Sequence, residues 1–102
     1  MGLFKVEIEE TAQQDIAVCV AFVLNVSKEA AIELTNDIYD QIYSLENFPE
    51  RNPLFEMQKS FPYLLRKQVI NKRYLAIYSI EGHSVKIYRF LDSRRNFESL
   101  LK

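Results

Sequence analysis

Apolar and charged residues alternate at the start of the chain. The stretch LFKVEIE, residues 3 to 9, sets three apolar side chains among three charged ones: Phe4, Val6 and Ile8 among Lys5, Glu7 and Glu9. A period of two residues is that of a strand with one covered face. We therefore expect the chain to begin with a strand.

The next stretch has the spacing of two helices. Thr11 followed by Gln14 matches a capping box, so a helix is expected from about residue 12 to residue 25. Ser27 can cap a second helix, on which apolar residues recur every three or four positions. The predicted apolar stripe consists of Ala31, Leu34, Ile38, Ile42 and Leu45. Because only a few residues separate the two helices, we expect an antiparallel hairpin.

A proline-rich connection and three strands follow. Residues 46 to 62, ENFPERNPLFEMQKSFP, hold all three prolines and have the composition of a loop. The pattern then predicts strands at residues 64 to 70, 73 to 80 and 84 to 91, with the short spacers NK and EGH suited to hairpin turns. The last segment, RRNFESLLK, is expected to form a short closing helix or tail with its apolar residues packed down.

The order of the predicted elements is β-α-α-β-β-β. This order indicates an α+β fold in which a helical hairpin packs on a small, mainly antiparallel sheet. The strand from Tyr74 to Ile80 is apolar on both faces and is expected at the centre of the sheet. A chain of 102 residues is expected to form a single domain, residues 1–102.

The composition argues against membrane and secreted classes. The longest apolar run, Ile16 to Leu24, has nine residues, whereas a bilayer span needs about 20. No membrane partner is therefore expected. The chain does not open with a signal-peptide pattern, and the lone Cys19 cannot form an intrachain disulfide and is interpreted as a small core residue. These features predict a cytoplasmic protein.

The net charge of −1 hides an uneven distribution of charge. Residues 1 to 61 contain four Lys and Arg against eleven Asp and Glu, a charge of −7. Residues 62 to 102 contain nine against three, a charge of +6. This asymmetry suggests that the second half faces an anionic partner, either nucleic acid or an acidic protein segment. The alternative is that the two halves attract each other or are simply solvated.

Residue counts exclude most catalytic and metal-binding motifs. Two glycines cannot form a glycine-rich phosphate loop, and one His with one Cys gives no metal-ligand spacing, so no cofactor and no metal are expected. His83 is predicted in a turn, where no scaffold orients it for catalysis. The carboxylates of the predicted helices have the spacing of solvent faces. The remaining candidates are arginines.

One arginine lies inside the last predicted strand, in VKIYRFLD. Strand alternation places Arg89 on the face of Val85, Ile87 and Leu91. A buried guanidinium without a partner is very costly, so Arg89 needs a carboxylate, a carbonyl array or a sheet edge open to water or ligand. An acid of the helical hairpin would make this a structural ion pair. Arg66, in the first of the three strands, could share a face with Arg89 and bind phosphate or carboxylate.

Three segments of the chain, together with its element order, carry a family resemblance. They are IYSLENFPERNP, LLRKQVINKRYLAIYSI and VKIYRFLDSRRNF. The combination of Arg66 in the first meander strand, the aromatic pair Tyr74 and Tyr78, and the pair Arg94 and Arg95 after the last strand resembles the RelE/ParE superfamily. Its members are toxins of type II toxin-antitoxin modules, also called plasmid stabilisation proteins. The resemblance covers nearly the whole chain.

The resemblance implies a toxin that a cognate antitoxin neutralises, with one of two mechanisms. RelE-like members are ribosome-dependent mRNA endonucleases that use basic and aromatic residues on the sheet, whereas ParE-like members poison DNA gyrase and are not nucleases. Arg66 and Arg94 stand where the nuclease set has basic residues, so the resemblance implies that they would be catalytic if this chain were a nuclease. The chain departs from that set where a lysine, an arginine and a tyrosine are expected, since it has Gln68, Leu75 and Phe97 there.

These departures favour a ParE-like gyrase poison that is not an enzyme. Cleavage by the RNA 2′-OH needs a proton acceptor, a proton donor and cations, and loss of one such group commonly costs about 10²-fold or more. A pI near 5.8 also argues against docking on ribosomal RNA. The alternatives are a RelE-like endoribonuclease and a degenerate, non-toxic relative. The residues expected to bind the target or the antitoxin are Arg66, Arg89, Arg94, Arg95 and Phe97.

Overall fold

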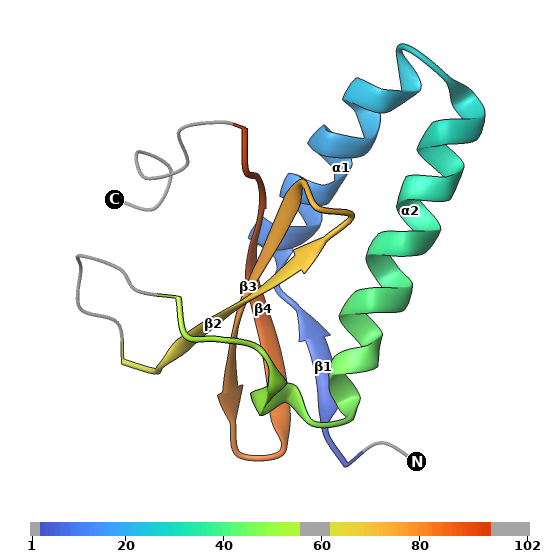
Figure 1. Cartoon of the computed structure of the whole chain (residues 1–102). Helices are drawn as coiled ribbons and strands as arrows, with labels where there is room; N and C mark the ends of the chain where they lie inside the picture. Colours follow the sequence, from blue (N-terminus) through green and yellow to red (C-terminus); the bar gives the residue numbers. More distant parts are fainter. Residues whose placement is uncertain (1–2, 56–61, 95–102) are drawn as a thin grey trace.

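A helical hairpin covers one face of a four-stranded sheet in the computed structural model, which describes residues 3–55 and 62–94 (Figure 1). The elements are β1 (Lys5–Ile8), α1 (Glu10–Leu24), α2 (Lys28–Tyr43), β2 (Leu65–Ile70), β3 (Tyr74–Glu81) and β4 (Ser84–Asp92). Of two 3-10 turns, Pro49–Arg51 lies in the predicted loop, and Ser44–Glu46 lies at its start and overlaps it only at Glu46. The predicted α+β class and the order β-α-α-β-β-β are confirmed.

The sheet has the strand order β1-β4-β3-β2. β1 runs parallel to β4, and the other two pairings are antiparallel, as a mainly antiparallel sheet requires. β3 lies between β4 and β2, and its residues from Tyr74 to Ser79 are buried. The predicted central place of this strand is therefore confirmed.

Both predicted hairpin turns form, and each uses positive φ angles. Gly82 has φ 64° in the two-residue turn between β3 and β4. Asn71 and Lys72 have φ 52° and 60°, and the N–H of Arg73 donates to the Ile70 carbonyl at 3.2 Å. Two central residues with positive φ are typical of a type I′ turn, whose twist suits a β-hairpin.

The two helices begin differently. Ser27 caps α2 as predicted, since its Oγ accepts from the Ala30 N–H at 3.1 Å. The capping box at Thr11 and Gln14 is wrong, because α1 begins at Glu10 and its N-cap residue Glu9 makes no side-chain cap bond. Glu9 instead donates its N–H to the Ile87 carbonyl at 2.9 Å. The chain passes directly from strand pairing into the helix, so the sheet determines where α1 begins.

The core lies between the helical hairpin and the sheet. The predicted apolar stripe, Ala31 to Leu45, is buried in full, and its members from Leu34 onward belong to one core cluster with residues of β3 and β4. α1 contributes Ala12 and Ile16, and half-buried Cys19 packs against the same cluster. Within residues 3–55 and 62–94, no helix combines the length and the apolar character that a bilayer crossing requires.

A β-bulge changes the pattern of β4. Ile77 pairs with Arg89 and Tyr78 pairs with Ile87, so Tyr88 has no residue opposite it. An extra residue in one strand disturbs the alternation of faces. Accordingly, Val85, Ile87 and Phe90 belong to the core under the helices, whereas Leu91 belongs to a second apolar cluster with Leu65, Leu75 and Ile77. The prediction that Arg89 shares one face with Val85, Ile87 and Leu91 is wrong.

Candidate binding surface

Arg89 forms a two-point ion pair with Asp15 of α1. Its Nε lies 2.7 Å from Asp15 Oδ2, and its Nη2 lies 3.0 Å from Oδ1. Asp15 Oδ2 also accepts the backbone N–H of Phe90 at 3.0 Å. The pairing of β1 with β4 ends at Ile87, so β1 does not reach the N–H of Phe90 on this edge of β4. Asp15 takes the place of a strand as the acceptor of that N–H. The hydrogen bond to Asp15 raises the pKa of Arg89, against the opposing effect of burial.

The environment of Arg89 is that of a structural residue. Of the acceptors that the sequence left open for Arg89, the structure shows a carboxylate of the helical hairpin. The side chains of Arg89 and Asp15 are only 22% and 17% exposed, so much of the pair is withdrawn from solvent. A pair of this kind joins α1 to β4 and leaves the guanidinium poorly placed to bind a second anion.

Arg66 also serves the fold. It lies opposite Tyr78 in the β2–β3 register, and its Nη1 donates to the carbonyls of Glu50 at 3.1 Å and Asn52 at 2.7 Å. These bonds hold the Pro49–Arg51 turn against the sheet. Arg66 and Arg89 lie on strands that flank β3 and bind different acceptors, so the structure does not bring them together.

Gln68 occupies a core position two residues after Arg66. It is buried, and its Nε2 donates to the Gln41 carbonyl of α2 at 3.2 Å. Its Oε1 is buried and has no hydrogen-bond partner among the described residues. A lysine at this position would enter the core and not an exposed site. Leu75, the second departure from the nuclease set, lies in the apolar cluster on the other face.

Arg94 lies at the end of β4, in a cluster around Asp92. Asp92 Oδ2 accepts from Nε and Nη2 of Arg73 at 3.3 and 3.2 Å, and Oδ1 accepts the Arg94 N–H at 3.0 Å. The Arg94 Nε lies 3.5 Å from the same Oδ1. Two guanidinium groups thus share one carboxylate, which leaves one positive charge in excess. The Arg94 side chain is 65% exposed, so its other donors can reach a partner.

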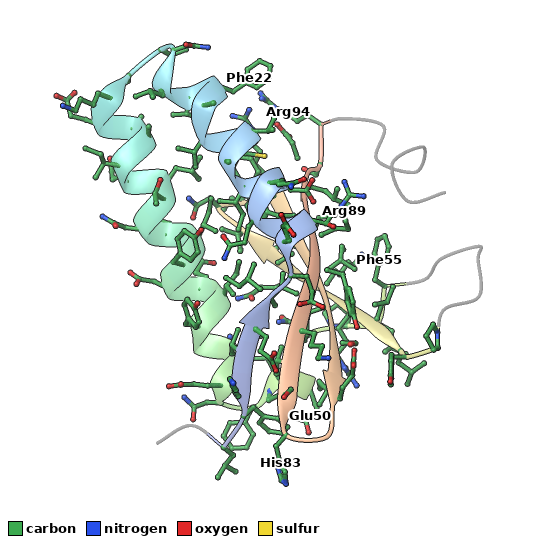
Figure 2. All side chains as sticks on the ribbon, turned by 180° about the vertical axis from the view of Figure 1, so that it is seen from behind. Phe22, Glu50, Phe55, His83, Arg89 and Arg94 are labelled. Carbon is green, nitrogen blue, oxygen red and sulfur yellow. The ribbon has the colours of Figure 1, made fainter. Side chains whose placement is uncertain are left out.

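An apolar depression adjoins this cation. Its volume is about 440 Å³, and it is lined by Cys19, Phe22, Asp92 and Arg94. Figure 2 shows Phe22 and Arg94 close together at one end of the molecule, where α1 passes the end of β4. Of the arginine pair predicted to bind, Arg95 lies outside the described residues, as does Phe97. Both remain predictions.

A polar cluster that the sequence reasoning missed lies near the β3–β4 turn. Glu81 Oε2 accepts from Ser79 Oγ and from the Tyr88 hydroxyl at 2.6 Å, and Lys86 Nζ lies 3.6 Å from Oε1. Burial alone would raise the pKa of Glu81, but the bonds from Ser79 and Tyr88 and the charge of Lys86 lower it. Burial and the bond to Glu81 raise the pKa of Tyr88 to about 12. The sequence pattern that could have revealed this cluster is Glu81 directly before the Gly82–His83 turn, with Lys86 and Tyr88 on the strand that follows.

This cluster is poorly suited to acid-base catalysis near neutral pH. Glu81 is ionised with a lowered pKa, so it is a weak base, and the Tyr88 proton is bonded to it. His83 lies exposed in the adjacent turn, as predicted, with its ring 6.4 Å from that of Phe4. In the part of the chain that the structure describes, no group of three His, Cys, Asp or Glu side chains is placed to hold a metal ion.

Comparison with solved structures places this arrangement among known folds. The chain is similar to a chain of the chromosomal ParDE TA system from P. aeruginosa, with a TM-score of 0.70 and 16% identity. The likeness covers 88% of this chain and 96% of the other. The chain has a ParE-like fold. No protein-family model matches the sequence, and no curated protein matches it either.

The ParE-like fold agrees with the resemblance found in the sequence. The element order in the structure is the one that the sequence predicted, and the likeness extends over most of both chains. The fold thus confirms the predicted architecture at an identity too low for residue-by-residue transfer. The chemistry of this ParE-like chain must be argued from its own side chains.

Proposed function

We propose that this chain is the toxin of a type II toxin-antitoxin module and that a cognate antitoxin neutralises it. The observation that carries the proposal is the ParE-like fold over 88% of the chain. The charge distribution supports it, because the segment from residue 62 to the end has a charge of +6 and suits an acidic partner. A disordered acidic segment that folds on binding is the kind of partner such a surface accepts.

The surface proposed for the antitoxin is the end of β4. Arg94 supplies an exposed cation, and Phe22 supplies exposed apolar area beside the same depression. An amphipathic segment with carboxylates along one edge would satisfy both features at once. Arg95 would add a second cation next to the first.

The proposed cellular target is DNA gyrase, in a mode that involves no RNA cleavage. Of the two residues that keep basic positions of the nuclease set, Arg66 donates to two loop carbonyls and Arg94 shares Asp92 with Arg73. Gln68, where that set has a lysine, is buried. Attack by the RNA 2′-OH requires proton transfers and cations beside a proton acceptor, and the described residues at these positions do not offer that combination. Ribosome-dependent mRNA cleavage is the alternative.

The test compares two activities of the same purified protein. Controlled expression of the chain should arrest growth, and co-expression of the small reading frame beside its gene should restore growth. The purified protein should inhibit gyrase supercoiling, whereas primer extension on translated messages should show no codon-linked cuts. Reproducible cuts in the ribosomal A site would restore the endonuclease alternative. Expression without any growth effect would overturn the toxin proposal.

A further inference from the structure

One exposed aromatic residue has a backbone conformation that its side chain disfavours. Phe48 has φ 52° and ψ 58°, in the left-handed region, and is 80% exposed. Bulky residues rarely adopt this region, where Gly and Asn are favoured. The fold thus tolerates two unfavourable features at one position: backbone strain and a phenyl ring in water.

Hydrogen bonds on both sides of Phe48 hold it in this conformation. Arg51 Nη1 donates to the carbonyls of Asn47 at 2.8 Å and Ser44 at 3.2 Å, and its Nη2 donates to Ser44 Oγ at 2.6 Å. The Arg51 N–H donates to the Phe48 carbonyl at 3.1 Å. One arginine therefore fixes the chain before and after the strained residue.

The next residue anchors the turn in the core. Pro49 is buried, and its carbonyl accepts from the Tyr78 hydroxyl at 2.6 Å. Tyr78 itself is fully buried in β3. Because Pro49 and Arg51 are both fixed, the backbone at Phe48 is held in place, and its side chain extends into solvent. A segment whose backbone is fixed before binding loses little backbone entropy when a partner covers it.

Phe48 has an apolar neighbour at the same end of the molecule. Leu3 is 81% exposed, and its N–H donates to the Glu46 carbonyl at 3.1 Å, two residues before Phe48. Glu46 and Glu50 are exposed on either side of Phe48. These four exposed residues, two apolar and two acidic, are near one another in sequence or through the Leu3–Glu46 bond, and we name them the Phe48 patch: Leu3, Glu46, Phe48 and Glu50.

The Phe48 patch lies far from the surface proposed for the antitoxin. Lys5 pairs with Ser84 at the start of β4, whereas Arg94 follows the end of β4. A strand of nine residues spans about 30 Å. Figure 2 likewise shows Glu50 and His83 at one end of the molecule and Phe22 and Arg94 at the other.

We infer that Phe48 is a binding anchor for the toxin's protein target. It inserts into an apolar pocket of that protein, and the pocket carries cations at its rim opposite Glu46 and Glu50. Aromatic side chains that fill a pocket of the partner are common anchors of protein interfaces. The acidic antitoxin segment is excluded as the occupant, since the two glutamates would repel it. The inference rests on the proposed function for the identity of the partner as a toxin target.

The test uses substitutions that relieve the strain and remove the ring. Phe48→Asn is compatible with the left-handed backbone, so it should raise the melting temperature by about 4 °C. It should also raise, by at least tenfold, the protein concentration needed for half-inhibition of gyrase supercoiling, and it should weaken growth arrest. Phe48→Trp keeps an aromatic anchor and should retain inhibition. Val69→Thr removes exposed apolar surface from β2, outside the patch, and should leave inhibition unchanged.

The outcomes separate this inference from the proposed function. A folded Phe48→Asn protein that inhibits as well as wild type would overturn the anchor and leave the toxin proposal standing. A Phe48→Asn protein that melts below wild type would show that Phe48 stabilises the fold, which also overturns the inference. If wild type arrests growth without inhibiting supercoiling, gyrase is the wrong target, and the growth assay on Phe48→Asn decides the anchor. A harmless wild type overturns the toxin proposal and, with it, the proposed partner.

Discussion

Removal of the Arg89 side chain should destabilise the protein by about 2 kcal/mol. Arg89→Ala deletes the two charge-assisted hydrogen bonds to Asp15, at 2.7 and 3.0 Å, and leaves the partly buried Asp15 bonded to the Phe90 N–H among the described residues. Hydrogen bonds to charged groups contribute about 1.5–3 kcal/mol each. The pair is about one-fifth exposed, so water replaces part of the loss.

Asp15→Ala should cost more than Arg89→Ala, about 3 kcal/mol. It removes the partner of the guanidinium and also leaves the Phe90 N–H without an acceptor at the open edge of β4. For a domain of about 100 residues, 1 kcal/mol corresponds to about 4–8 °C in melting temperature. Arg89→Ala should therefore melt about 8–16 °C below the wild-type protein.

Urea unfolding of the two single variants and the double variant measures the coupling. The double variant should be little worse than Asp15→Ala alone, with a coupling free energy of about 1.5 kcal/mol. Arg94→Ala is the matched control, since its side chain is 65% exposed and should cost less than about 0.5 kcal/mol. Additive costs for Arg89→Ala and Asp15→Ala, within about 0.5 kcal/mol, would refute the role assigned to the pair.

Three further predictions concern other sites. The double variant Arg94→Ala, Arg95→Ala should leave the melting temperature nearly unchanged and should weaken antitoxin affinity. The affinity of the wild-type protein for the antitoxin should fall steeply with salt, and equal wild-type affinity at two salt concentrations would contradict this. Because folding lowers the pKa of Glu81, its ionised carboxylate stabilises the folded state at pH values above 4.5, the ordinary pKa. This stabilisation is lost as the pH falls through the folded-state pKa. Glu81→Gln should thus be less stable than wild type at about pH 7, and the difference should shrink as the pH falls below 4.5. A pH-independent difference in urea unfolding would argue against the hydrogen bonds from Tyr88 and its neighbours as the cause. Gln68→Met loses the bond to the Gln41 carbonyl but also removes a buried oxygen that has no partner among the described residues, so it should match or exceed wild-type stability by up to about 1 kcal/mol. A loss above about 1 kcal/mol in thermal unfolding would show that the amide is needed.

The sequence alone determined the elements and their order. The period of two in residues 3 to 9, the stripe from Ala31 to Leu45 and the short spacers between the last strands are local patterns, and each corresponds to an observed element. Local patterns are informative because helix and strand periods follow from backbone geometry. The need of Arg89 for an acceptor also followed from the sequence, with an acid of the hairpin among the alternatives, since a buried charge must be paired.

Tertiary structure decided which residues meet and which remain available. Arg89 and Asp15 lie 74 positions apart, and no local pattern identified Asp15 among the acids of the hairpin. The bulge at Tyr88 moved Leu91 away from the face of Val85 and Ile87, which strict alternation does not foresee. The start of α1 was decided by a bond between Glu9 and the sheet.

The candidate site depended even more on the folded chain. Arg66 and Arg94 look equivalent in sequence, but the loop carbonyls bind Arg66, whereas Arg94 extends into solvent. The strain at Phe48 was likewise invisible, because Arg51 and the buried Pro49 impose it through contacts with α2 and β3. Periodicity reports which face of an element is apolar. Where hydrogen-bonding groups find their partners depends on packing between elements, and that packing decides which cations and aromatic rings remain free to bind.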